Sequence, residues 1–174
     1  MKLNAKQLRV TLPTEEQLSK IKRRPIYIVL DNVLDTYNVG SIFRLADAIA
    51  AQEVVLCGQT ETPPNSRIHK AAVGTEEWIN WRYFKTASEF LKDFKGQIVA
   101  VEQDSRSASI INFQFSIFKN YPVAIVIGHE TDGISKDVLD MADIIVEIPM
   151  EGINKSLNVH VAASIVLYKL ISFV

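Results

Sequence analysis

Residues 26–50 read IYIVLDNVLDTYNVGSIFRLADAIA, and this stretch decides the fold class. It begins with a mostly β-branched apolar run, Ile26 to Leu30, which is typical of a buried strand. Apolar residues then recur at the spacing of one helix face: Ile42, Leu45, Ala46 and Ile49. The pattern predicts a helix that begins near Asn38, whose side chain can cap the first turn. A strand followed at once by a helix is the repeating unit of α/β proteins.

The same alternation continues along the rest of the chain. Four further apolar runs predict strands at Val54–Cys57, Gln97–Val101, Val123–Ile127 and Ile144–Ile148. Three helices are predicted between or after them: one from a capping box at Thr86–Glu89 to Gly96, one from Ser135 to Met141, and one from Asn158 to about Ile171. The sequence therefore predicts an α/β fold on a parallel sheet.

Composition fits one globular domain inside the cell. The chain has 174 residues, of which 48% are hydrophobic and 22% charged. The single cysteine, Cys57, excludes a disulfide framework and a multi-cysteine metal site. No apolar stretch approaches the roughly 20 residues that cross a bilayer, and the polar start MKLNAKQLRV is unlike a signal peptide. We expect a soluble protein of the cytoplasm.

The charge is unevenly distributed. The net charge of −1 argues against a nucleic-acid binder, which usually carries a basic excess. Residues 1–24, however, hold seven basic and two acidic residues, which gives 7 − 2 = +5 and leaves −6 for the rest. The basic ones are Lys2, Lys6, Arg9, Lys20, Lys22, Arg23 and Arg24. This segment is either a solvated terminal helix or a basic arm that binds nucleic acid.

Ligands of open α/β sheets bind beyond the carboxyl ends of the strands, so three loops there are of interest. The first, DNVLDTYNVGSIFR, brings Asn38 and Arg44 to the start of a helix. Arg44 offers a planar set of donors suited to phosphate. A capped helix with one surface arginine is the plainer interpretation.

The other two loops follow the predicted strands at 123–127 and 144–148. IGHETDGIS holds Glu130 between two glycines, where a buried or half-buried carboxylate needs polar partners; a tight turn before a capped helix would look the same. IPMEGINKSLN ends in Ser156 and Asn158, each of which could simply cap the last helix.

Several classes of site are excluded by missing motifs. His129, Glu130 and Asp132 lack the second histidine of a zincin, so we expect no metal. No glycine-rich turn follows the first strand, and the chain has no P-loop and no G-x-S-x-G string. A non-catalytic RNA-binding module remains the alternative to an enzyme.

Taken together, the three loops resemble the signature motifs of the SpoU (TrmH) branch of the SPOUT methyltransferases. The matching patterns are N-x-G-x-x-x-R, I-G-x-E-x-x-G-I and I-P-M-x-G-x-x-x-S-L-N-V, in that order. The resemblance extends to KAAVGTEEWINW and covers roughly residues 26 to 172. The compact tRNA guanosine 2′-O-methyltransferases are most similar.

The resemblance implies a domain of residues 26–174 behind a basic arm of residues 1–25. Its fold would be a parallel sheet with helices on both faces and a C-terminal trefoil knot, the SPOUT fold. It further implies a homodimer in which catalytic residues approach from the neighbouring subunit, with S-adenosyl-L-methionine as cofactor. The residues implied to hold the cofactor are Val101, Gly128, Ile148, Met150 and Leu157.

The implied reaction is methyl transfer to a ribose 2′-hydroxyl in RNA, tRNA in preference to rRNA. The implied catalytic group is Asn38, Arg44, Glu130, Ser156 and Asn158, and the implied RNA-binding group is Lys22, Arg23, Arg24 and Arg44. A guanidinium is a poor base near neutral pH, so we expect Arg44 to clamp an RNA phosphate. That phosphate or Glu130 would accept the proton, while Asn38, Ser156 and Asn158 hold Arg44 and its loop.

Overall fold

The computed structural model describes residues 12–118 and 121–173. Within them, seven parallel strands form one sheet in the order β3-β2-β1-β6-β4-β7-β5. The strands are β1 (Arg24–Asp31), β2 (Ala51–Cys57), β3 (Trp81–Phe84), β4 (Gln97–Val101), β5 (Ala108–Ser109), β6 (Val123–Gly128) and β7 (Ile144–Glu147). All five predicted strands are confirmed, and β3 and β5 were missed.

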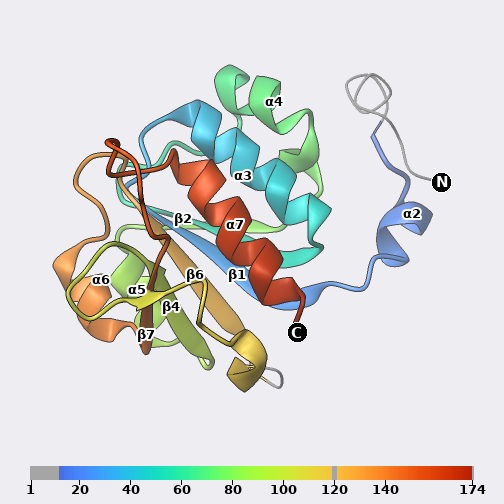
Figure 1. The fold of residues 1–174 in the computed structure, drawn as a ribbon. Helices are drawn as coiled ribbons and strands as arrows, with labels where there is room; N and C mark the ends of the chain where they lie inside the picture. The colour runs from blue at the N-terminus through green and yellow to red at the C-terminus, as the bar shows by residue number, and fades with distance from the viewer. Residues whose placement is uncertain (1–11, 119–120, 174) are drawn as a thin grey trace.

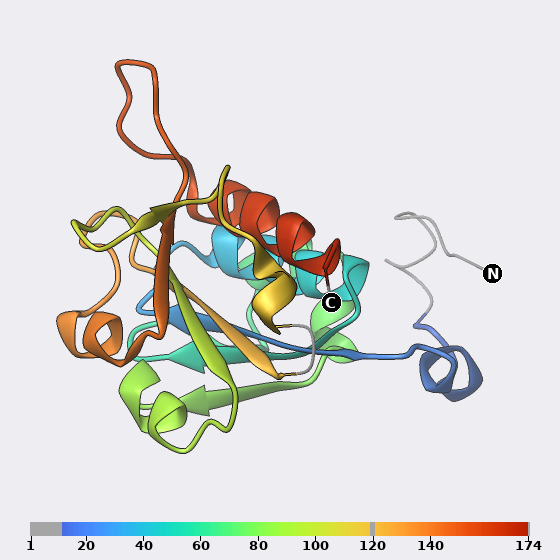
Figure 2. The same ribbon diagram turned by 60° about the horizontal axis from the view of Figure 1, so that its bottom comes forward.

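Helices cover both faces of the sheet (Figures 1 and 2). One face carries α3 (Thr36–Ala48), α4 (Ser66–Ala72) and α7 (Val159–Ile171), and the other carries α5 (Ala87–Lys92) and α6 (Lys136–Met141). The shorter elements are α2 (Glu15–Ser19), η1 (Thr75–Glu77) and η2 (Phe115–Phe118). The predicted layer arrangement is therefore confirmed. No helix in the described ranges is long and apolar enough to cross a membrane.

Buried strands explain why the sheet holds together. Every residue of β6 is buried, and the pairings of β6 with β1 and with β4 place apolar residues against both helix layers. These buried pairings set the positions of the middle strands. The loops at the carboxyl ends of β1, β4, β6 and β7 therefore lie together at one edge of the sheet.

Three predicted helix ends need correction. Asp35 caps α3 by accepting a hydrogen bond from Tyr37 N, so Asn38 is not the cap. Thr86 does cap α5, but Glu89 accepts a hydrogen bond from Lys85 N instead of completing a capping box, and the helix ends at Lys92 before Gly96. Thr86 is thus confirmed as the cap of α5, whereas the capping box and the end at Gly96 are not found.

The predicted boundary between arm and domain falls inside β1. Arg24 is the first residue of that strand, and Pro25 the second. The half-buried side chain of Arg23 donates hydrogen bonds to Ala51 O and Trp78 O, so it ties the chain to the body. Lys2, Lys6 and Arg9 lie outside the described residues.

Candidate functional site

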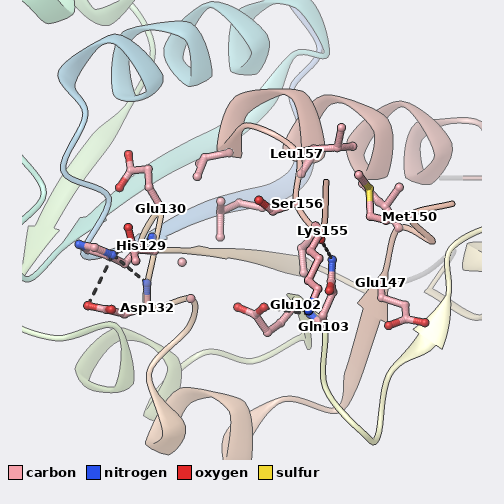
Figure 3. Close-up of a pocket in the computed structure, with 18 residues that line it drawn as sticks. Glu102, Gln103, His129, Glu130, Asp132, Glu147, Met150, Lys155, Ser156 and Leu157 are labelled. Atoms are coloured by element: carbon pink, nitrogen blue, oxygen red, sulfur yellow. Dashed lines mark hydrogen bonds and ion pairs between the residues drawn. The ribbon is translucent and has the colours of Figure 1, made fainter. Parts of the chain in front are cut away.

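A pocket of about 400 Å³ opens at the carboxyl edge of the sheet (Figure 3). It lies between the ends of β4, β6 and β7, the loop after β7 and the first turn of α7. All five residues expected to hold the cofactor line it, although they come from the ends of β4 and β6 and from the loop after β7: Val101, Gly128, Ile148, Met150 and Leu157. A pocket of this size with mixed polar and apolar walls suits a small organic ligand.

The wall after β6 is a closed turn built on two glycines. His129 and Gly133 exchange backbone hydrogen bonds of 3.0 and 3.1 Å, and Gly133 has a φ of +72°. His129 Nδ1 accepts hydrogen bonds from Thr131 N and Asp132 N, each 3.0 Å long (Figure 3). An added Cβ at Gly128 would lie 2.3 Å from the carbonyl carbon of Gly133. The turn therefore fits only with glycine at position 128.

Two residues after β4 support this wall and were missed by the sequence analysis. Glu102 accepts hydrogen bonds of 2.9 Å from Ile134 N and Gln103 N. The Gln103 amide donates to Lys155 O, which ties the loop after β7 to the end of β4. Both residues line the pocket. Their position in the sequence could have indicated this role, because they follow a predicted strand at its carboxyl end, as the three loops considered above do.

Glu130 faces the segment after β1, as Figure 3 shows. Its carboxylate accepts hydrogen bonds from Leu34 N at 3.1 Å, Asp35 N at 3.0 Å and Asn38 Nδ2 at 2.9 Å. Burial acts to raise the pKa of Glu130, but these three donors outweigh it and lower the pKa below its ordinary value. Glu130 is therefore ionised at neutral pH and is a weak proton acceptor.

The Glu130 contact continues into the last helix. Asn38 is only 2% exposed, and its Oδ1 lies 3.2 Å from Nδ1 of His160 on α7. The chain of polar contacts Glu130–Asn38–His160 thus joins the loop after β6, helix α3 and helix α7. His160 was missed by the sequence analysis, because nothing in the sequence indicates that α7 packs against α3.

The remaining predicted catalytic residues do not converge. Arg44 is exposed on α3, does not line the pocket, and makes no hydrogen bond or ion pair with any described residue. Ser156 lines the pocket and is exposed, and Asn158 caps α7 by accepting from His160 N. The expectation that Asn38, Ser156 and Asn158 hold Arg44 through hydrogen bonds is wrong within this chain.

The basic residues 22–24 lie at the amino end of β1, away from the carboxyl edge of the sheet where the pocket opens. β1 is eight residues long, which separates its two ends by about 25 Å. Figure 2 shows the N-terminal segment leaving the body on the side away from the pocket-forming loops. Lys22 is exposed there. Lys22, Arg23 and Arg24 therefore stand away from the pocket of their own chain.

The pocket does not gather a set of metal ligands. His129 accepts from its own turn, Glu130 faces Asn38, and Asp132 is exposed. In the ranges 12–118 and 121–173, one group of His and Glu residues lies close enough together to hold an ion, and it stands elsewhere, at His69, Glu76 and Glu77. The only cysteine, Cys57, is buried, and this raises its pKa to about 12, so its thiol is not a nucleophile.

Comparison with known proteins gives consistent matches. Residues 25–168 match the model of the SpoU rRNA Methylase family. A tRNA (guanosine(18)-2′-O)-methyltransferase of Escherichia coli K12 is 31% identical over 152 residues, which are 85% of this chain and 64% of that protein. A 23S rRNA (guanosine-2′-O-)-methyltransferase of Ralstonia nicotianae is 29% identical over 167 residues, 95% of this chain and 66% of that protein. The chain thus spans slightly under two thirds of these relatives.

Solved structures share the fold. The AdoMet-bound rRNA methyltransferase from Sinorhizobium meliloti superposes with a TM-score of 0.77 at 27% identity, covering 86% of this chain and 57% of that one. A TrmH/SpoU tRNA modifying enzyme from A. aeolicus gives a TM-score of 0.78 at 24% identity, covering 97% of this chain and 81% of that one, and shows the likeness of fold.

Proposed function

The chain belongs to the SpoU rRNA methylase family, and on that premise we propose that it transfers a methyl group from S-adenosylmethionine to a ribose 2′-hydroxyl in RNA. The observation that carries the proposal is the convergence on one pocket of five residues from the ends of β4 and β6 and the loop after β7. Each of the five was chosen from the sequence as a cofactor contact. The names of the relatives, which act on tRNA and on 23S rRNA, support the same reaction.

The pocket fits S-adenosylmethionine on physical grounds. Its volume of about 400 Å³ is within the usual range for small-molecule sites, and Ile148, Met150 and Leu157 give it an apolar side. Gly128 keeps the turn after β6 closed against the pocket, because a Cβ at this position would meet the backbone of Gly133 and Ile134. When bound, S-adenosylmethionine supplies an electrophilic methyl group on a sulfonium. The apolar wall excludes water from that group.

Calorimetry should detect one S-adenosylmethionine bound per chain, with the same Kd in the presence of EDTA, at a temperature well below unfolding. We expect no effect of EDTA because the pocket gathers no set of metal ligands. A folded protein that binds neither S-adenosylmethionine nor its demethylated product would refute the proposed reaction. A Kd for S-adenosylmethionine that rises when EDTA is added would refute the expectation that the pocket needs no metal ion.

Glu130 and Asn38 are proposed as positioning residues. In the proposed reaction the ribose 2′-oxygen would take the methyl group from the sulfonium, which would leave as a thioether, and the hydroxyl proton would pass to an acceptor. Glu130 already accepts three hydrogen bonds and its pKa is lowered, so we favour an RNA phosphate held by Arg44 as that acceptor. Glu130 instead fixes the start of α3, the helix that carries Arg44.

A homodimer is proposed as the form that completes the site. Arg44 does not line the pocket of its own chain, which supports a site that takes Arg44 of the partner subunit. Helix α7 supplies a surface for pairing, since Val161, Ile165 and Tyr168 form an exposed apolar stripe at helical spacing. Leu167 and Leu170 of the same helix are buried in this chain's own core and are not available for pairing.

Replacing Ile165 with Glu should convert the dimer to a monomer at micromolar concentration, because a charge would be buried without a partner. Light scattering gives the mass of each form. Tyr83→Glu, on the edge strand β3, is the matched control: Tyr83 is also exposed, and the dimer should persist. A wild-type monomer at tens of micromolar, an order-of-magnitude concentration for a stable interface, would contradict the dimer.

We also propose the C-terminal trefoil knot. The supporting contacts lie between the end of the chain and the segment after β4. Lys155 O accepts from the Gln103 amide, and Lys169 Nζ donates to Ile110 O and Ile111 O. Lys155 and Lys169 thus fasten the end of the chain against the segment after β4, through which a knot of this family would pass.

The proposed substrate is tRNA, because the segments KAAVGTEEWINW and IPMEGINKSLNV resemble those of the compact tRNA guanosine 2′-O-methyltransferases. The proposed location is the cytoplasm. Ribosomal RNA is the alternative, since curated relatives act on both. Mapping ribose methylation in total RNA from cells with and without the gene decides between them. A methyl group lost from one tRNA position supports the proposal, whereas a loss confined to rRNA assigns the alternative.

A further inference from the structure

Three potential metal ligands meet on the side of the molecule that carries α4. His69 stands on α4, while Glu76 and Glu77 stand on η1. Their ligand atoms lie within 4.8 Å of one another, and all three residues line a cleft of about 550 Å³ together with Pro63, Pro64, Asn65, Ser66 and Trp81. None of them lines the pocket at the carboxyl edge of the sheet.

The carboxylate of Glu76 is the second and independent observation. The residue is only 6% exposed. Its Oε1 contacts Nδ1 of His69, but its Oε2 is buried and has no hydrogen-bond partner. A buried carboxylate oxygen without a partner is costly, and it is the only such side-chain atom in the described part of the chain. A bound cation would remove this cost.

The backbone explains how residues seven positions apart come together. Val73 and Gly74 both adopt left-handed conformations, with φ of +59° and +90°, and they reverse the chain between α4 and η1. The Thr75 hydroxyl donates to Ala72 O and closes the turn. Glu76 is thereby directed back at the last turn of α4, where His69 stands. This turn is rigid, because both of its ends are hydrogen-bonded.

We propose that His69, Glu76 and Glu77 bind one divalent transition-metal ion, for which Zn²⁺ is the best match. An imidazole nitrogen with carboxylate oxygens suits Zn²⁺, whereas Mg²⁺ and Ca²⁺ prefer oxygen ligands alone. Two carboxylates also balance a double positive charge. Ligands about 2.1 Å from Zn²⁺ stand about 3.4 Å apart. The exposed side chains of His69 and Glu77 would therefore adjust around the buried Glu76, and His69 would exchange its direct contact with Glu76 for a bond to the ion.

The ion would act on the fold and not on methyl transfer. It would join α4 to η1, and α4 packs against α3, where a Cβ at Gly40 would lie 2.5 Å from Ile68 O. No metal was expected from the sequence because His129, Glu130 and Asp132 lack the second histidine of a zincin, and His69, Glu76 and Glu77 were not considered. The proposed ion changes that expectation for this cleft. For the pocket at the carboxyl edge of the sheet, we still expect no metal.

The experiment uses the whole chain, freed of metal by dialysis against a chelator and then given Zn²⁺ or Mg²⁺. We expect one Zn²⁺ per chain by elemental analysis and calorimetry. At a free Zn²⁺ concentration of about 100 times Kd, the unfolding midpoint should rise by about 5–10 °C. Mg²⁺ at the same concentration should give no rise. Co²⁺ in place of Zn²⁺ should give a visible absorption band.

Variants locate the ion. Glu76→Gln and His69→Gln should each raise the Kd for Zn²⁺ by about a hundredfold or more and abolish the Co²⁺ band. Glu76→Gln removes the buried charge, so the metal-free variant should fold at least as stably as the metal-free wild type. His129→Gln is the matched control, because His129 accepts hydrogen bonds within its own turn, and it should bind Zn²⁺ as the wild type does.

Three results would overturn the proposal. The first is less than about 0.2 Zn²⁺ per chain at about 100 μM free Zn²⁺, order-of-magnitude limits for a specific site, and the second is unchanged Zn²⁺ affinity in Glu76→Gln. Loss of Zn²⁺ in His129→Gln alone would place the ion elsewhere and equally refute it. S-adenosylmethionine binding is a separate measurement, so failure of the metal site leaves the proposed methyl transfer untouched.

Discussion

Gly128→Ala is expected to raise the Kd for S-adenosylmethionine by about ten- to a hundredfold. The added Cβ would lie 2.3 to 2.5 Å from the backbone of Gly133 and Ile134, atoms that cannot swing aside as a side chain could. The turn after β6 would have to move outward, at a cost typical of overpacking, about 1–3 kcal/mol. The same movement would pull Glu130 away from Asn38. Calorimetry measures the effect directly.

Folding stability is the main alternative cause of such a loss, and two variants separate it. Gly152→Ala adds the same methyl group in the loop after β7, where a Cβ meets nothing within 4 Å, so its unfolding midpoint should equal that of the wild type. Leu157→Ala trims an exposed pocket side chain and should weaken binding without unfolding the protein. If both Gly128→Ala and Leu157→Ala bound S-adenosylmethionine as the wild type does, the cofactor would not bind in this pocket.

The sequence predicted the long buried strands well because their apolar runs are unambiguous. β1, β2, β4, β6 and β7 each carry such a run. β3 was missed because its four residues, WRYF, are mostly exposed at an edge of the sheet and show no apolar run. β5 has only two residues. Short edge strands are decided by their neighbours in space, which a local pattern does not contain.

The start of α3 shows why the capping residue was harder to predict than the helix itself. Three polar residues, Asp35, Thr36 and Asn38, stand within four positions, and any of them can cap a helix. Asp35 caps it, which leaves the buried Asn38 free to contact Glu130 and His160. The choice depends on contacts 92 and 122 residues away along the chain. No local signal reports them.

The candidate site was predictable in part, and the motif resemblance supplied most of it. The five cofactor residues converge, because loops at the carboxyl ends of parallel strands must share one edge. Glu102, Gln103 and His160 were missed because their roles are hydrogen bonds to those loops and to Asn38. Arg44 stands apart, and its proposed role depends on a second chain that one sequence does not display.

Arg44→Ala is expected to reduce methylation of RNA by about a hundredfold or more at saturating S-adenosylmethionine. The guanidinium is proposed to fix an RNA phosphate beside the reacting ribose, and misplacing the ribose loses the orientation contribution to the rate. The change should not disturb the fold, since Arg44 is exposed and has no partner among the described residues. S-adenosylmethionine affinity should therefore stay the same. Single-turnover methylation of tRNA from cells that lack the gene measures the rate.

Two further variants distinguish orientation from general attraction to RNA. Arg44→Lys keeps the charge but loses the planar pair of donors, so it should restore little of the rate. Lys22→Ala, at the far end of β1, should leave turnover at saturating RNA intact while it weakens RNA binding and flattens its dependence on salt. If Arg44→Ala kept normal turnover while Lys22→Ala lost it, the two regions would have exchanged roles. The basic arm would then belong to the reaction centre, and Arg44 to the surface that holds the rest of the RNA.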